Sequence, residues 1–140
     1  MLPPADFIYA GLSLPFCQPA CFAATWAQIR SALRPGARFA GHLFGARDSW
    51  VGDSTMSFFT LTAACQLLDG LEIEYFHEID EYGASFVGPK HWHIFELIAR
   101  QPLGKLTKPR LTPCARSIGP VLLMSYATTS WPPRILTPRR

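Results

Sequence analysis

Hydrophobic residues along the chain fall into short runs that predict a layered α/β domain. Residues 6–12 form an apolar run without alternation after the first position, which is typical of a strand buried on both faces. Residues 37–45 predict a second short buried strand. Between them, residues 21–33 carry large apolar side chains at helical spacing: Phe22, Trp26, Ile29 and Leu33. Pro35 and Gly36 are expected to stop this helix, which predicts a right-handed βαβ unit.

The following segment predicts another helix and a closing hairpin. Residues 61–68 have a helical apolar stripe, with Thr60 as a plausible N-cap and Gly70 as the C-terminal stop. Residues 71–80 alternate, which indicates a half-exposed strand near a sheet edge. Its expected inward face is Leu71, Ile73, Tyr75, His77 and Ile79. Residues 81–90 are expected to form a turn region, and residues 91–99 the second strand of the hairpin.

The charge divides the chain in two. The formal charge is +3, yet residues 1–100 contain ten acids and six bases, whereas residues 101–140 contain seven bases, no acid and seven of the thirteen prolines. We therefore expect a folded portion over residues 1–101 and a basic, proline-rich, irregular and disordered tail over residues 102–140. The bases of the tail are too scattered to favour nucleic-acid binding.

Neither membrane insertion nor secretion is indicated by the sequence. No apolar run approaches the roughly 18 residues that span a bilayer, and the short apolar run near the start has no basic segment before it. We expect a cytoplasmic protein with reduced thiols. Cys17 and Cys21 leave open a metal shared with a histidine, but their spacing has no matching second pair.

Three stretches appear in the order of elements of a known family. They are DFIYAGLSLPFC (6–17), ALRPGARFAGHLFGARDSW (32–50) and HWHIFELIAR (91–100). Together, over residues 5–101, they resemble the C-terminal half of the catalytic domain of class I S-adenosylmethionine-dependent methyltransferases. In that family a strand that opens with Asp precedes a helix ending in LRPGG, and a hairpin closes the sheet. This chain departs at Ala37, where a second glycine is usual.

The resemblance implies a partial Rossmann-like sheet of about four strands, the last two antiparallel, and methyl transfer from S-adenosylmethionine to a small molecule. The glycine-rich strand and loop that cradle the cofactor in that family have no counterpart in these 140 residues. We therefore expect a truncated catalytic domain, which by itself neither binds S-adenosylmethionine nor transfers a methyl group.

The resemblance also implies where ligands would bind, because open α/β sheets bind them beyond the carboxyl ends of their strands. The implied cofactor-side residues are Asp6, Tyr9, Ser13, Pro15 and Phe16, and the implied acceptor-side residues are Arg47, Asp48 and Trp50. His91 is the candidate general base. Aromatic and proline walls would exclude water and attract the cationic sulfonium.

Simpler interpretations remain open for several of these residues. Tyr9 and Phe16 also suit plain packing, and His91 and His93 on one strand face would need a third ligand to hold a metal, so we predict none. An alternative function is a non-enzymatic α/β interaction module that uses an open sheet edge and the basic tail. The strand at 6–12 would leave such an edge bare, which predicts self-association.

Overall fold

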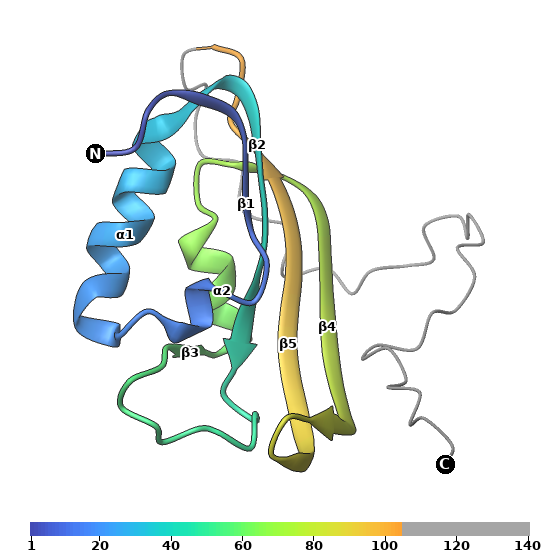
Figure 1. Cartoon of the computed structure of the whole chain (residues 1–140). Coiled ribbons are helices and arrows are strands. Elements are labelled where there is room, and N and C mark those ends of the chain that lie inside the picture. Colours follow the sequence, from blue (N-terminus) through green and yellow to red (C-terminus); the bar gives the residue numbers. More distant parts are fainter. Residues whose placement is uncertain (105–140) are drawn as a thin grey trace, which may run out of the picture.

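Two helices cover one face of a sheet in the computed structural model, which describes residues 1–104 (Figure 1). The predicted tail lies outside the described residues apart from its first three positions. The elements in chain order are β1 (Ala5–Ala10), a 3-10 turn η1 (Leu14–Phe16), α1 (Pro19–Ala32), β2 (Leu33–Gly45), β3 (Phe58–Phe59), α2 (Leu61–Leu67), β4 (Glu72–Ser85) and β5 (Gly88–Arg100).

The sheet has the strand order β1-β2-β5-β4, and the two-residue strand β3 pairs with the end of β2. β1 and β2 are parallel, β5 runs antiparallel to β2, and β4 runs antiparallel to β5. The predicted α/β class, the βαβ unit and the closing antiparallel hairpin are therefore confirmed. β4 lies at an edge of the sheet, as its alternating pattern predicted.

The core lies between the helices and the inward face of the sheet. The predicted stripe of α1 is buried, and the Trp26 ring packs edge-on against Phe39 of β2 with centroids 5.0 Å apart. The Trp26 indole N–H also donates to the carbonyl of Leu67 at 3.0 Å, which ties α1 to α2. Both helices are thus fixed over the centre of the sheet, where Phe39, Leu43, Phe95, Leu97 and Ala99 are almost fully buried.

The join between α1 and β2 differs from the prediction. The helix ends at Ala32, and β2 begins at Leu33, so Pro35 and Gly36 lie inside the strand rather than in a turn that stops the helix. Ala5 pairs with Leu33 but Phe7 pairs with Arg38, so β2 bulges here. Gly36 has φ +82°, a conformation that favours glycine, and its N–H donates to the Gln101 carbonyl at 2.8 Å.

The second face of the sheet is open, which contradicts the prediction that the first strand is buried on both faces. Phe7 and Tyr9 of β1 are 59% and 65% exposed. Within residues 1–104, α1 and α2 lie on the other side of the sheet, so the apolar residues of β1 on this face have no helix over them. An unalternated apolar run therefore did not mark burial here.

The hairpin is longer than predicted and its faces are shifted. Most of the expected turn region, 81–90, belongs to β4 and β5, and only residues 86–87 separate the two strands. A register irregularity between Ile73 and Tyr75 breaks the alternation, so Ile73 and Phe76 pack on the core, while Tyr75 lies half-exposed on the other face. The prediction that Ile73, Tyr75 and His77 share one face was therefore wrong.

The ends of α2 follow the sequence signals. The Thr60 side chain accepts a hydrogen bond from the Ala63 N–H at 3.1 Å, as an N-cap does. Gly70 has φ +80° just after the helix. Within residues 1–104, no helix has the length and apolar character to cross a membrane.

Because of the register irregularity in β4, two neighbouring aromatic residues should contribute differently to stability. Phe76→Ala removes a ring that packs 5.6 Å from the Phe95 ring and should lower the free energy of unfolding by about 2–4 kcal/mol. Tyr75→Ala removes a half-exposed ring and should cost less than about 1 kcal/mol. Urea denaturation followed by circular dichroism measures both values. A larger cost for Tyr75 would contradict the shifted faces.

Candidate functional site at the carboxyl ends of the parallel strands

Three segments meet where β1 and β2 end and β5 begins, at the lower edge in Figure 1. Residues 13–16 follow β1, and the loop 46–57 follows β2. The Ser57 N–H donates to the Pro15 carbonyl at 2.8 Å, and the Ser49 N–H donates to the His91 carbonyl at 3.0 Å. These bonds join the loop to both neighbouring segments, and we call this meeting point the rim.

A buried ion pair lies at the centre of the rim. The Lys90 Nζ is 2.5 Å from the Asp48 Oδ1, and the two side chains are only 4% and 0% exposed. The ammonium sits over the rings of Trp50 and Trp92, 3.5 and 3.8 Å from their centroids, with Phe44 at 5.0 Å. Cation–π attraction and the carboxylate together offset the loss of hydration.

Asp48 is held on all sides by the protein. Its Oδ1 also accepts from the backbone N–H of Trp50 at 3.0 Å, and its Oδ2 accepts from the backbone N–H of His93 at 3.2 Å. Burial lowers the pKa of Lys90, although Asp48 opposes that shift. Asp48 therefore organises the loop through contacts within the protein, and its acceptor-side role stays a prediction. No local pattern in the sequence indicates Lys90 as its partner.

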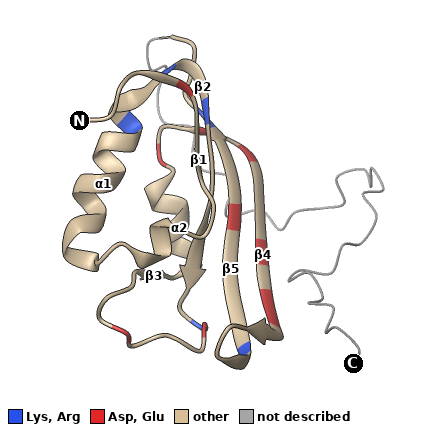
Figure 2. Cartoon of the chain, in the orientation of Figure 1, with Lys and Arg blue, Asp and Glu red and all other residues tan. Residues whose placement is uncertain are grey.

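Arg47 forms the centre of a second, more exposed network. This network lies on the same face of the sheet as the helices, outside the area that the helices cover. Its guanidinium donates to Glu78 at 2.7 Å and to Asp80 at 2.8 Å through Nε. The hydrogen bond from Arg47 lowers the pKa of Asp80, and the same contacts raise the pKa of Arg47. Figure 2 shows the acidic positions along β4, beside which this arginine lies. The predicted acceptor-side Arg47 is thus paired with the protein's own carboxylates.

Glu78, Asp80 and His93 lie close enough together to resemble a metal site, and among residues 1–104 they are the one such group. Two contacts explain why their geometry is that of an ion-pair network. The backbone N–H of Arg47 donates to the His93 Nδ1 at 2.9 Å. A neutral His93 therefore carries its proton on Nε2, which lies 2.8 Å from the Glu78 Oε1. A ligating Nε2 would need a lone pair there. Cys17 and Cys21 lie outside this group.

His91 has both ring nitrogens engaged. Its Nδ1 lies 2.7 Å from the Arg47 carbonyl oxygen, and its Nε2 lies 2.8 Å from the Asp80 Oδ1. Both partners are acceptors, so both contacts are satisfied when each nitrogen carries a proton. A general base needs a free lone pair within reach of the substrate. The catalytic role of His91 therefore stays a prediction that would require one of these contacts to open.

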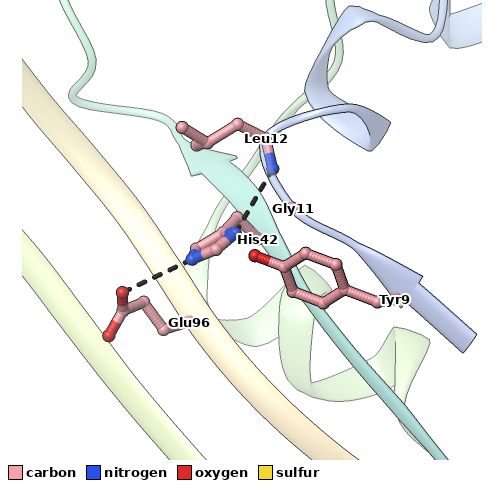
Figure 3. A pocket seen from close by; sticks show the side chains of 5 residues that line it. All are labelled: Tyr9, Gly11, Leu12, His42 and Glu96. Atoms are coloured by element: carbon pink, nitrogen blue, oxygen red, sulfur yellow. Dashed lines mark hydrogen bonds and ion pairs between the residues drawn. The ribbon is translucent and has the colours of Figure 1, made fainter. Parts of the chain in front are cut away.

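A cavity of about 320 Å³ opens on the uncovered face of the sheet, next to the end of β1 (Figure 3). Tyr9, Gly11, Leu12, His42 and Glu96 line it. The His42 Nδ1 accepts from the Leu12 N–H at 3.3 Å, and its Nε2 lies 3.4 Å from the Glu96 Oε1. A neutral His42 therefore points its N–H at this carboxylate. We call this feature the Tyr9 cavity.

The backbone beside the Tyr9 cavity is unusual. Leu12 has φ +48°, and it is the one non-glycine residue with positive φ among residues 1–104. A Cβ at Gly11 would overlap the Tyr9 hydroxyl, so the ring needs a glycine to lie where it does. Sequence reasoning missed His42 and Glu96. They are direct partners across β2 and β5, and only the register of these two strands brings them together.

The remaining predicted residues are divided between the rim and other places. Phe16 lies at the rim, half-exposed, with its ring centroid 5.9 Å from Phe44 and 6.4 Å from Trp50. Ser13 precedes η1, and Pro15 is buried beneath the loop. Asp6 lies at the opposite end of β1, where it accepts from Arg34 at 2.7 Å. The predicted residues of segments 13–16 and 46–57 and His91 therefore lie at the rim, whereas Tyr9 lines the Tyr9 cavity and Asp6 lies at the far end of β1.

Comparison with solved structures identifies the fold. TehB from Haemophilus influenzae superposes with a TM-score of 0.58 at 11% identity, over 72% of this chain and 37% of that one. A SAM-dependent methyltransferase from Methanosarcina mazei superposes with a TM-score of 0.52 at 21% identity, over 71% of this chain and 60% of that one. No protein-family model and no curated protein matches the sequence.

The chain therefore has the arrangement of strands and helices of part of the class I S-adenosylmethionine-dependent methyltransferase fold, as the three sequence stretches predicted. It spans about a third of the length of the first structure and three fifths of the second. At these identities the likeness establishes the arrangement of strands and helices, and the chemistry has to be argued from this chain's own residues.

The buried ion pair predicts a strong coupling between Lys90 and Asp48. Lys90→Met leaves a buried carboxylate without its partner and should lower the free energy of unfolding by about 3–5 kcal/mol. Adding Asp48→Asn removes the stranded charge while keeping an acceptor for one of the two backbone N–H groups, and should recover at least about 1 kcal/mol. Urea denaturation of both single variants and the double variant measures the coupling. Additive losses would contradict it.

The Arg47 network predicts acid sensitivity. Because Arg47 holds the pKa of Asp80 below its ordinary value of 3.8, this pair contributes stability above that value and loses it as pH falls through the lower, folded-state pKa. The difference in unfolding free energy between the parent chain and Arg47→Met should therefore be largest near neutral pH and shrink on acidification. Denaturation curves recorded at several pH values from neutral to acid measure this difference. A difference that does not change with pH would contradict the stabilising contact between Arg47 and Asp80.

Proposed function

We propose that this fold serves methyl transfer from S-adenosylmethionine to a small molecule, with residues 1–104 forming the side of the site that holds the sulfonium and the acceptor. The observation that carries the proposal is the joint position of the Tyr9 cavity and the aromatic rim at the carboxyl end of the methyltransferase-like sheet. Ligands of open α/β sheets bind at this end of the strands.

The Tyr9 cavity has the chemistry for a small organic cation. The half-exposed Tyr9 ring offers an aromatic face, and Glu96 provides a carboxylate that is about one third exposed. The contacts of Glu96 within the protein are long, at 3.4 Å to both His42 and the Tyr75 hydroxyl. A carboxylate held this loosely is available to a cationic ligand, and an adjacent aromatic face adds cation–π attraction.

The rim has the chemistry for positioning an acceptor. Phe16 and Trp50 form an aromatic wall, and the Lys90–Asp48 pair fixes the loop that carries Trp50. In methyl transfer, most of the rate enhancement comes from holding the nucleophile in line with the methyl group and excluding water. These residues would orient the acceptor and exclude water. His91 would move a proton at Nε2 if its contact with Asp80 opened.

The cofactor as a whole does not fit the described residues. S-adenosylmethionine supplies the electrophilic methyl group when it is bound, and its sulfonium suits the Tyr9 cavity. In residues 1–104, however, the loops around the cavity offer neither a glycine-rich turn nor a carboxylate placed for the ribose hydroxyls. We therefore assign to this chain the recognition of the sulfonium end alone.

This assignment predicts a specific binding pattern for residues 1–140. Calorimetry should detect no micromolar binding of S-adenosylmethionine, and trimethylsulfonium should bind about as weakly as the whole cofactor, because only the sulfonium is recognised. Nuclear magnetic resonance titration measures this weak binding through shifts of the Tyr9 and Glu96 signals. Glu96→Gln keeps the shape of the side chain, removes its charge and should abolish the shifts. Uncharged tert-butanol is the matched ligand control.

Two outcomes would contradict the proposal in different ways. Micromolar binding of S-adenosylmethionine would show that the chain holds the whole cofactor, against the assignment of the sulfonium end alone. Equal shifts with trimethylsulfonium and tert-butanol, or shifts that survive Glu96→Gln, would show that the Tyr9 cavity does not recognise cations. The second outcome would remove the basis of the proposed function.

A further inference from the structure

β1 ends the sheet without a partner on its outer side. It pairs with β2, and no other strand within residues 1–104 pairs with it. A strand in this position presents unpaired backbone N–H and C=O groups that can bind another strand. On the open face its exposed side chains are apolar, since Phe7 and Tyr9, which are 59% and 65% exposed, both lie there.

The two edges of the sheet differ in how they are protected. Soluble proteins protect edge strands with charges, prolines or bulges. β4, at the other edge, has five acidic side chains along it: Glu72, Glu74, Glu78, Asp80 and Glu81. β1 has a single charge, Asp6, which is paired with Arg34 at 2.7 Å, and no proline between Ala5 and Ala10. β1 is therefore the edge suited to pairing.

We propose that two copies of this chain associate by antiparallel pairing of their β1 strands, about a two-fold axis that passes between Ile8 of one copy and Ile8 of the other. An axis perpendicular to the sheet keeps the open faces on the same side, so residues facing each other must come from the same face. The register centred on Ile8 places Phe7 opposite Tyr9 of the partner subunit, and Asp6 opposite Ala10 of the partner subunit.

This register uses the features that make β1 unusual. Each of the two Phe7–Tyr9 contacts becomes a cross-strand aromatic pair, which is a stabilising combination in antiparallel sheets. No charge is placed opposite another charge. Because the interface is self-complementary, it closes as a dimer, and the four-strand path of each copy becomes half of a continuous sheet of eight strands.

The test compares two variants that are equally polar at the same two positions. In Phe7→Lys/Tyr9→Glu, the proposed register places each lysine opposite a glutamate of the other copy, so the dimer should persist. In Phe7→Lys/Tyr9→Lys, it places lysine opposite lysine, so the dimer should be lost. Sedimentation velocity of the full 140-residue chain at micromolar concentrations measures the mass, with the parent expected at twice 15.6 kDa.

A further variant controls for the loss of aromatic surface. Tyr82→Lys/Phe86→Lys removes two rings that are 82% and 104% exposed near the hairpin end, away from β1, and should leave the dimer intact. Circular dichroism confirms that each variant is folded. A monomeric parent chain, open-ended aggregates, a dimer that survives Phe7→Lys/Tyr9→Lys, or a folded but monomeric Phe7→Lys/Tyr9→Glu would each overturn the proposal.

Discussion

The ion pair between Lys90 and Asp48 fixes the relation between the sheet and the loop on which the rim depends. The loop 46–57 contains no helix or strand, and backbone hydrogen bonds from Ser57 and Ser49 join it to its neighbours. Asp48 binds Lys90 at the start of β5 and accepts from the backbone of its own loop and from that of His93. One buried carboxylate thereby connects the end of β2 to β5, and the rings of Trp50 and Trp92 exclude water from the pair.

A second constraint follows from the close approach of backbone and side chain at Gly45. A Cβ at this position would overlap the His93 ring, so the imidazole lies against the end of β2 only because residue 45 is glycine. From that position His93 accepts from the Arg47 N–H and reaches Glu78. The Arg47 network on β4 and the buried pair at Lys90 are therefore built on the same turn after β2.

The sequence allowed the order and type of most elements to be predicted, because they depend on local patterns. The helical stripe of α1 and the Thr60 cap of α2 were correct for this reason. The errors arose where pairing decides the outcome. The irregularity at Ile73 shifts the faces of β4, and the uncovered face exposes Phe7 although it begins an apolar run. Local periodicity contains no information about either.

The candidate site divides in the same way. Trp50, Asp48 and Arg47 were found because they follow a predicted strand, and the resemblance places ligands beyond the carboxyl ends of the strands. Their partners were not found, since Lys90 lies 42 residues from Asp48 and meets it only through the sheet. His42 and Glu96 escaped notice for the same reason, because their relation is a register pair across β2 and β5.

The charged groups at the rim have short contacts within the protein and Glu96 has long ones, and this difference is why we propose a cation site on the open face. At the rim, Asp48, Arg47, His91 and His93 all have close partners in the protein, between 2.5 and 3.2 Å away. A ligand binding to them would have to break these contacts. Glu96 lies on the face that no described helix covers, with partners at 3.4 Å or beyond. A cation bound there would break no short contact within the protein.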